Sequence, residues 1–235
     1  MTSVPEVLAV DGDKSRAADA APSSLRGVHR SLRMAAQVYD FEGLVPVIDP
    51  SAYVHPSAVL IGDVFIGPRC YIGAGAVFRG DFGRIVLEEE ANVQDNCVVH
   101  SLPDFDCVME RRSHIGHGAV IHGCRIGAGA LIGMQAVVLD KAVVGEDALV
   151  AAMTLVKVAQ QIPPAVMVTG VPAKVVRALN AKDLAWKRDG TDWYVELAER
   201  SARGVRAVDA LEGADAVRLA QRTAWQHLLG KTEGG

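Results

Sequence analysis

The sequence predicts a mainly β protein, a parallel β-helix of six-residue repeats followed by α-helices. Aliphatic residues recur every six positions over most of the stretch from residue 54 to residue 156. The residue four places after each of them is mostly small. Half of all residues are hydrophobic, yet only 5% are aromatic. This composition suits a thin, repetitive core of Val, Ile, Leu and Ala.

Three segments are expected: a disordered N-terminal tail (1–37), a β-helix domain (38–168) and a C-terminal helical segment (169–230). Residues 1 to about 33 are rich in Ala, Ser, Asp and Arg and have no apolar period, so burial cannot offset their ordering entropy. Met34 lies just before the first stretch of folded composition. A translation start at Met34 instead of Met1 is therefore one hypothesis that the sequence suggests.

The aliphatic positions form one long series with three irregular steps. The period slips by three residues after Asp81, the polar segment SLPDFD (101–106) interrupts it, and one later step has five residues. Three hexapeptides make one triangular coil of about 18 residues, and stacked coils bury the aliphatic positions and complete the backbone hydrogen bonds. In order, the positions are Val54, Leu60, Ile66, Ile72, Phe78, Leu87, Val93, Val99, Ile115, Ile121, Ile126, Ile132, Val138, Val144, Val150 and Val156.

The character of the sequence changes after the proline pair at 163–164. Charged and apolar residues are interleaved at helical spacing from 174 to about 206, and a second helical pattern runs from about 214 to 229. We expect a helical cover whose aromatic side chains pack on a face of the β-helix, with a substrate cleft lined by them as the alternative. The aromatic residues concerned are Trp186, Trp193 and Trp225.

Charge and cysteine content exclude several classes of partner. A formal net charge of -4 provides no basic surface for nucleic acid or for a membrane. No run approaches the roughly 18 apolar residues of a membrane span, and no signal pattern opens the chain. The cysteines form no CxxC pair, so they are predicted to be buried thiols of a cytoplasmic protein. They are Cys70, Cys97, Cys107 and Cys124.

The histidines in and near SHIGHGAVIHGC (113–124) raise the question of a metal site. His100 and His122 each follow an aliphatic position, and their spacing is one coil plus a four-residue loop. They should share one face, with rings about 5 Å apart. Arg79 also follows an aliphatic position, one coil and the three-residue slip earlier. It should therefore stack beneath His100.

His117 lies on the preceding strand and points in another direction, so it cannot easily join the pair of its own chain. A copy from an adjacent subunit could do so, which makes a three-fold oligomer with shared metal sites the natural arrangement. The alternative is that outward histidines on such a fold are solvated surface residues. To that class we assign His29, His55, His114 and His227.

Several motifs resemble those of the γ-class carbonic anhydrase family. They are RGDFGRI (79–85), NVQDNCVVH (92–100), HGAVIH (117–122) and GMQAVV (133–138), in the family's order and spacing. The runs HPSAVLIGDV, HIGHGAVIHGC and VPAKVVRAL are most similar to the branch that contains the PaaY-like phenylacetate-degradation proteins and the CaiE-like carnitine-operon proteins. The resemblance covers roughly residues 38 to 205.

The resemblance implies a left-handed β-helix and a homotrimer. It implies zinc, with iron or cobalt as alternatives, bound at each subunit interface by His100, His117 and His122. Three neutral imidazoles leave Zn²⁺ an open position at which water becomes hydroxide near neutral pH. An amide can fix that water or stabilise an oxyanion. Inter-subunit ion pairing and orientation of the water are the roles implied for Arg79, Asp81, Gln94 and Asp95.

The activity implied is hydrolysis of an acyl-CoA thioester by zinc-bound hydroxide, as in aromatic or related acyl-CoA catabolism. Hydration of CO₂ to bicarbonate is the alternative within the family. Phe82 replaces a glutamate of the archaeal carbonic anhydrase, and SLPDFD (101–106) does not reproduce its acidic proton-shuttling loop. An acyltransferase with one histidine as general base leaves His100 and His117 without a role. A non-catalytic structural trimer is the fourth hypothesis.

Overall fold

The computed structural model describes residues 36–210, and in this range the chain forms a parallel β-helix of about seven turns with one α-helix. The first sheet, which we call face 1, has eight strands. Its last two strands are antiparallel and the others are parallel. Its strands are β3 (Tyr53–Val54), β5 (Tyr71–Ile72), β7 (Asn92–Val93), β10 (His114–Ile115), β13 (Leu131–Ile132), β16 (Leu149–Val150), β19 (Val166–Thr169) and β20 (Lys174–Ala178).

The second sheet has 12 strands and folds around a corner, so that it supplies the other two faces. Two long strands, β4 (Val59–Ile66) and β6 (Val77–Leu87), belong to both faces. Face 2 continues with β1 (Gln37–Tyr39), β8 (Val98–His100), β11 (Val120–His122), β14 (Val137–Val138) and β17 (Leu155–Val156). Face 3 continues with β2 (Val47–Ile48), β9 (Cys107–Met109), β12 (Arg125–Ile126), β15 (Val143–Val144) and β18 (Gln161–Ile162).

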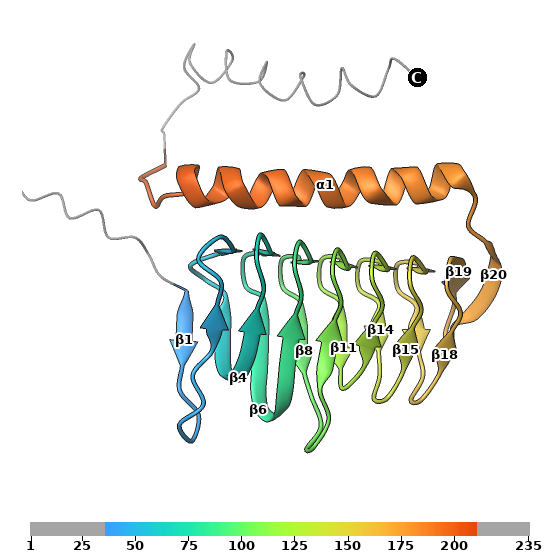
Figure 1. Cartoon of the computed structure of the whole chain (residues 1–235), viewed down its shortest axis with the longest axis horizontal. Coiled ribbons are helices and arrows are strands. Elements are labelled where there is room, and N and C mark those ends of the chain that lie inside the picture. Colours follow the sequence, from blue (N-terminus) through green and yellow to red (C-terminus); the bar gives the residue numbers. More distant parts are fainter. Residues whose placement is uncertain (1–35, 211–235) are drawn as a thin grey trace, which may run out of the picture. The chain divides into compact units, whose positions relative to one another are not determined.

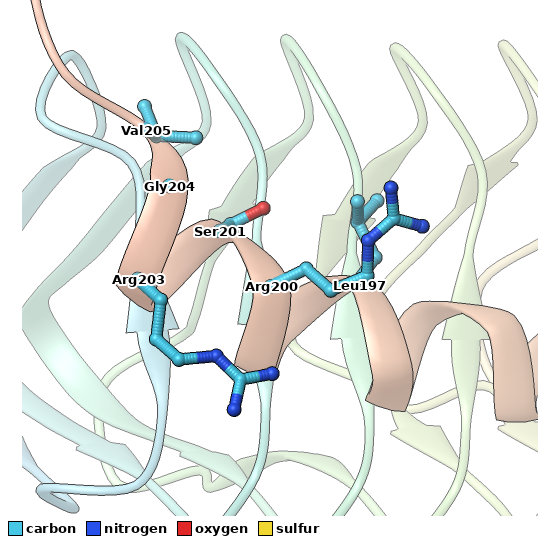
Figure 2. A pocket seen from close by; sticks show the side chains of 6 residues that line it. All are labelled: Leu197, Arg200, Ser201, Arg203, Gly204 and Val205. Atoms are coloured by element: carbon cyan, nitrogen blue, oxygen red, sulfur yellow. The ribbon is translucent and has the colours of Figure 1, made fainter. Parts of the chain in front are cut away.

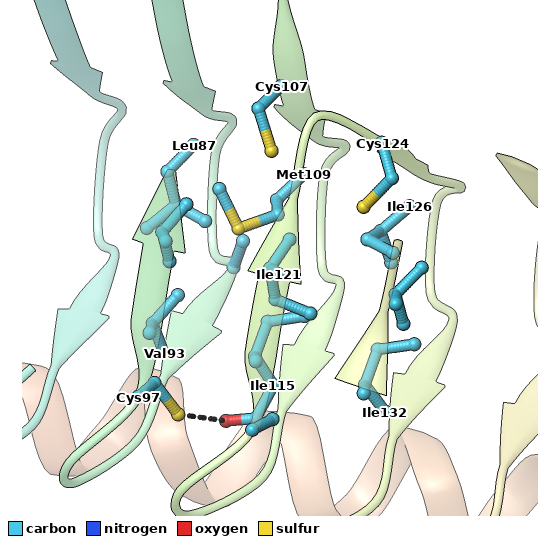
Figure 3. Packing of buried hydrophobic residues seen from close by; sticks show 14 of the residues in the cluster. Leu87, Val93, Cys97, Cys107, Met109, Ile115, Ile121, Cys124, Ile126 and Ile132 are labelled. Carbon is cyan, nitrogen blue, oxygen red and sulfur yellow. Dashed lines mark hydrogen bonds between the residues drawn. The ribbon is translucent and has the colours of Figure 1, made fainter. Parts of the chain in front are cut away.

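The core is the column of aliphatic residues that the six-residue period predicts. From Leu60 to Val156, each predicted aliphatic position is buried. Most of the small residues four places after an aliphatic position, such as Ala76, Cys97 and Ala136, are buried beside them. Figure 3 shows successive coils contributing one layer each, with Leu87, Met109 and Ile126 following one another along face 3. All four cysteines are free and buried in this column, as predicted. The fold class predicted from the sequence is confirmed, whereas its left-handed winding stays a prediction.

The irregular steps of the sequence lie where the register of the strands changes. Gly62 pairs with Gly80, but Val64 pairs with Ile85, so three extra residues protrude from β6. We call the four residues between Gly80 and Ile85, which lie opposite the single residue Asp63 of β4, the β6 insertion (81–84). The polar segment 101–106 fills the corresponding place in the next coil, between β8 and β9. The pairing on face 2 and on face 3 is nevertheless continuous, because the long strands β4 and β6 pair with their neighbours both before and after the insertion.

Helix α1 (Ala181–Gly204) begins later than the interleaved charges predict. The stretch 174–178 is the strand β20, which closes the last coil by pairing with β19. Its residues mix charged and apolar side chains without strict alternation and are all exposed, so the pattern did not distinguish an edge strand from a helix. Asn180 caps the helix: its side chain accepts from the backbone N–H of Asp183, whose carboxylate accepts from the backbone N–H of Asn180.

α1 runs along the stack and crosses successive coils (Figure 1). Lys187 anchors it: its side chain is only 2% exposed, and its ammonium donates to the carbonyl oxygens of Gly129 and Asp147, both at 2.8 Å, and to the Asp147 carboxylate at 2.9 Å. Further along, Tyr194 packs edge-on against Tyr71, with ring centroids 5.2 Å apart. The helix therefore covers face 1 with a buried cation in its first half and a tyrosine near its middle.

The tryptophans do not form the predicted cover. Trp186 is 60% exposed and Trp193 is 48% exposed, so both turn away from the β-helix. The buried residues of α1 are Lys187, Thr191, Ala198 and Ser201, so apart from Tyr194 the helix meets the β-helix mainly with small and polar side chains. The remaining predictions for the tail, for the helix at 214–229 and for Trp225, His29 and His227 lie outside the described residues. Among residues 36–210, no helix is long and apolar enough to cross a membrane.

Candidate functional site

The first histidine cluster lies where face 2 turns into face 3, which we call the second corner. His100 and His122 are directly paired in the register of β8 and β11, and Arg79 pairs with His100 in the register of β6 and β8. The ring centroids of the two histidines are 5.0 Å apart. The predicted column of Arg79, His100 and His122 is confirmed, because stacked coils place equivalent outward positions one strand apart.

Two carboxylates hold the rings of this pair. Asp81, on the β6 insertion, lies 2.9 Å from His100 Nε2 and also accepts from the guanidinium of Arg79 at 3.0 Å. Asp140 lies against His122 Nδ1 from the next coil. Burial would raise the pKa of Asp81, but the hydrogen bonds from His100 and Arg79 outweigh it and lower that pKa below its ordinary value. Asp81 is therefore an ionised acceptor at neutral pH.

The carboxylates fix which nitrogens carry hydrogen. A carboxylate can only accept, so His100 is protonated at Nε2 and His122 at Nδ1. The remaining nitrogens, His100 Nδ1 and His122 Nε2, lie 3.0 Å apart. In two neutral rings both of these nitrogens carry lone pairs that face each other. A shared proton or a bound cation relieves that repulsion, and carboxylate-backed imidazoles with converging lone pairs are the arrangement found in metal sites.

His117 lies at a different place, where face 1 turns into face 2, which we call the first corner. Its Nδ1 is 3.0 Å from a carboxylate oxygen of Asp95, so its Nε2 carries the lone pair. The side chain is exposed to solvent. Across the part of the chain that the structure describes, no group of three His, Cys, Asp or Glu side chains could hold a metal ion. One chain thus presents a histidine pair at one corner and a single histidine at another.

Gln94 does not reach the histidine pair of its own chain. It is buried on face 1, where its Nε2 lies 3.2 Å from the Asn92 carboxamide oxygen and 2.6 Å from His114 Nε2. His114 was predicted to be a solvated bystander, and that prediction is wrong. It lies under α1, with Tyr194 edge-on at 5.2 Å between ring centroids. Burial above all, with the charges of His117 and Lys187, lowers the pKa of His114 to about 4.

Two members of these clusters were not predicted. Asp140 lies 18 residues after His122, one residue beyond the equivalent position in the next coil, because β11 and β14 pair at a spacing of 17 residues, so counting coils leads to Leu139 instead. Asn92 lies two residues before Gln94, a separation that brings same-side residues of an extended strand together. His55 is partly exposed and belongs to neither corner, as predicted: its Nδ1 lies 2.8 Å from the hydroxyl of Ser57 and accepts from the Ser57 backbone N–H at 3.1 Å, and its ring lies edge-on to Tyr53.

A hollow at the C-terminal end of α1 is separate from all of these histidines (Figure 2). It is open, and its lining consists of α1 residues and the residue that follows the helix. Nothing in it matches the chemistry of the two corners. The lining residues are Leu197, Arg200, Ser201, Arg203, Gly204 and Val205.

The fold and the corners define the class: this is a hexapeptide-repeat protein of the parallel β-helix type. No protein-family model matches the chain. The carnitine operon protein CaiE of Proteus sp. (strain LE138) is 46% identical to it over 181 residues, which is 77% of this chain and 92% of that protein. CaiE of Escherichia coli K12 is 48% identical over 162 residues, 69% of this chain and 83% of that protein. The chain belongs to the CaiE family.

Solved structures agree on the fold. A Bacillus cereus protein, provisionally described as an acetyltransferase, is 34% identical, with a TM-score of 0.71 over 72% of this chain and 98% of its own. A hexapeptide transferase family protein from Anaplasma phagocytophilum is 32% identical, with a TM-score of 0.67 over 69% of this chain and 96% of its own. The likeness to γ-class carbonic anhydrases and to the PaaY branch stays a prediction.

Proposed function

We propose that the chain is a metal-dependent hydrolase of acyl-CoA thioesters that acts as a homotrimer. The observation that carries the proposal is that His100, His117 and His122 each have one ring nitrogen held by a carboxylate, which leaves the other free as a ligand. The pair of one chain and His117 of its neighbour would complete a three-histidine site. Zinc, or iron or cobalt, would supply a Lewis acid with an open position there.

The chain's own residues supply orientation around that site. Asp81, Asp95 and Asp140 fix the ring tautomers, and Arg79 holds Asp81 in place. In hydrolysis, an oxygen of water bonds to the acyl carbon, the carbon–sulfur bond breaks, and the thiol leaves with a proton. The carboxylate-backed imidazoles would keep that reaction centre at the trimer interface, where the neighbouring chain excludes bulk water.

The geometry narrows the role of Gln94. Both hydrogens of its amide nitrogen are engaged, one with Asn92 and one with His114. Donation to an oxyanion would break one of these bonds, whereas its carbonyl oxygen can accept from a water without any change. Of the two roles expected for Gln94, the orientation of a water molecule is therefore the one that fits. His114 must stay neutral for this, because its Nε2 is the acceptor.

A subunit-mixing experiment tests the shared site. His117→Ala and His122→Ala should each abolish stoichiometric metal binding and hydrolysis of phenylacetyl-CoA. When the two inactive proteins are unfolded, mixed in equal amounts and refolded, about a quarter of the interfaces pair an intact His117 with an intact His100–His122 pair. We expect about a quarter of the metal content and activity to return. His55→Ala serves as the control, since the contacts of His55 are with Ser57 and Tyr53 and not with any residue of the two corners.

Failure would take distinct forms. Metal bound by each variant alone would contradict the three-histidine site. If metal binding returns on mixing but thioester hydrolysis does not, two alternatives remain: a carbonic anhydrase and a structural metal. A CO₂ hydration assay distinguishes between them. No metal in the native protein would contradict the whole proposal.

An acyltransferase is the second candidate, because both solved relatives carry transferase names. In this reading one histidine acts as general base on an acceptor and no metal is needed. It predicts acetyl transfer from acetyl-CoA by protein stripped of metal, with His117→Ala fully active. The three carboxylate-backed histidines favour the hydrolase, since a transferase would use one of them.

A further inference from the structure

We propose that Phe82 and Leu102 form an apolar wall that binds the acyl group of the substrate and selects a neutral, apolar one. This inference rests on the proposed thioesterase function and adds the substrate class. The ring of Phe82 lies 5.3 Å from the ring of His100, centroid to centroid, at an interplanar angle of 42°. The phenylalanine is 61% exposed. An aromatic ring that lies against His100, a candidate metal ligand, and faces solvent can contact a substrate bound beside that histidine.

The β6 insertion presents Phe82 in this way. The three extra residues leave the ladder, so Phe82 cannot turn into the core as a residue of a regular strand could. Gly83 lies directly beneath segment 101–106: a Cβ there would collide with the carbonyl oxygens of Leu102 and Phe105. The insertion is therefore packed tightly on its inner side, and the phenyl ring is fixed outward beside His100.

Leu102 extends the wall toward His122. A Cβ added to Gly123 would stand 3.2 Å from Leu102 Cγ, which places this side chain against the backbone next to His122. Gly123 in turn donates its N–H to the carbonyl oxygen of His100 at 3.0 Å. Phe82 therefore borders one histidine of the pair and Leu102 the backbone beside the other, and both are apolar. Carbon dioxide is too small to use such a surface, whereas an aryl or alkyl acyl group is not.

The charges around the wall disfavour a cationic acyl group. Arg79 pairs with Asp81, and Arg84 pairs with Asp63 at 3.1 Å. In both pairs the carboxylate is mostly buried and the guanidinium is about half exposed. Solvent and substrate therefore meet two positive groups near Phe82. A trimethylammonium group could otherwise stack on the phenyl face, but it would be repelled here.

The test compares four thioesters of coenzyme A: acetyl, hexanoyl, phenylacetyl and the cationic betainyl. With Phe82→Ala, we expect kcat/KM to fall about 3- to 10-fold for phenylacetyl-CoA, mostly through KM, and less than 2-fold for acetyl-CoA, since only the former reaches the ring. Leu102→Ala should act in the same direction on hexanoyl-CoA. Phe65→Ala is the control, because Phe65 lies under Arg84 and not against a histidine.

Calorimetric binding of a non-hydrolysable phenylacetyl-CoA thioether provides a second readout. We expect its Kd to rise with Phe82→Ala by the same factor as KM. Equal losses for acetyl- and phenylacetyl-CoA, a preference of the native protein for betainyl-CoA, or dissociation of the Phe82→Ala trimer would each overturn the inference. If the native protein hydrolyses no thioester yet binds the thioether through Phe82, the proposed function fails and the apolar wall stands.

Discussion

The second corner and face 1 use histidine in opposite ways. At the second corner, the rings of His100 and His122 have carboxylate partners and face each other across 3.0 Å. On face 1, His114 is covered by α1 and its Nε2 accepts from the amide of Gln94, with no carboxylate of the described residues at either ring nitrogen. A carboxylate that holds one ring nitrogen leaves the other nitrogen to a cation, whereas burial lowers the pKa of His114 and keeps that ring neutral. The comparison predicts that changes on face 1 affect stability and changes at the second corner affect metal affinity.

The largest effect is expected at Lys187. Lys187→Met keeps the aliphatic stem but leaves two carbonyl oxygens and the Asp147 carboxylate without their donor, so the free energy of unfolding should fall by about 3 kcal/mol. Urea unfolding measures this. Lys182→Met, on the exposed start of the same helix, should change it by less than about 0.5 kcal/mol. Equal effects of the two substitutions would show that the buried ammonium does not anchor α1.

Lowering the pH should destabilise the protein through protonation of His114 on face 1. Its pKa lies near 4 in the folded protein, below the ordinary value of about 6.5, so the unfolded chain takes up the proton first. Stability from this group is complete above about pH 6.5 and falls as the pH drops toward 4, by about 3 kcal/mol at the limit.

The variant His114→Gln isolates this contribution, because it can still accept from Gln94 but does not titrate. We expect the dependence of unfolding free energy on pH to be shallower by about one proton between pH 6.5 and 4. An unchanged slope would mean that His114 is not neutral in the folded protein.

The opposite pattern is expected at the second corner. Asp140→Asn removes the anion behind His122, so zinc affinity should fall about 10- to 100-fold while the unfolding free energy of the metal-free protein stays within about 0.5 kcal/mol. Competition with a chromophoric chelator measures the affinity. Asp104→Asn, an exposed residue of segment 101–106, is the matched control. A loss of stability without a loss of affinity would reverse the assignment of the two regions.

What the sequence could predict follows the stacking of the coils. A fixed period fixes which residue lies above which, so the core column and the pairing of Arg79, His100 and His122 followed from counting. Counting alone could not place His114, because its burial depends on α1, which arrives from far along the chain. The engagement of Gln94 with His114 was hidden for the same reason.

The prediction that Trp186 and Trp193 pack on the β-helix failed for a different reason. Helical spacing shows that a residue lies on a helix, but the direction of its side chain depends on how the helix docks. Here the docking is set by the buried ammonium of Lys187, which turns Trp186 and Trp193 outward. A charged anchor is not the signal that a search for an apolar stripe detects.

The smallest effect on stability is therefore expected at Trp186. Little or no change there would show that only the buried side chains of α1 hold the helix on face 1. The side chain is 60% exposed, next to the residue that anchors the helix, so Trp186→Ala should change the unfolding free energy by less than about 0.5 kcal/mol. Thermal unfolding of the two proteins at matched concentrations measures this. A loss above about 1 kcal/mol that grows with protein concentration would mean that Trp186 packs against a second copy of the chain, and that α1 belongs to an interface as well as to face 1.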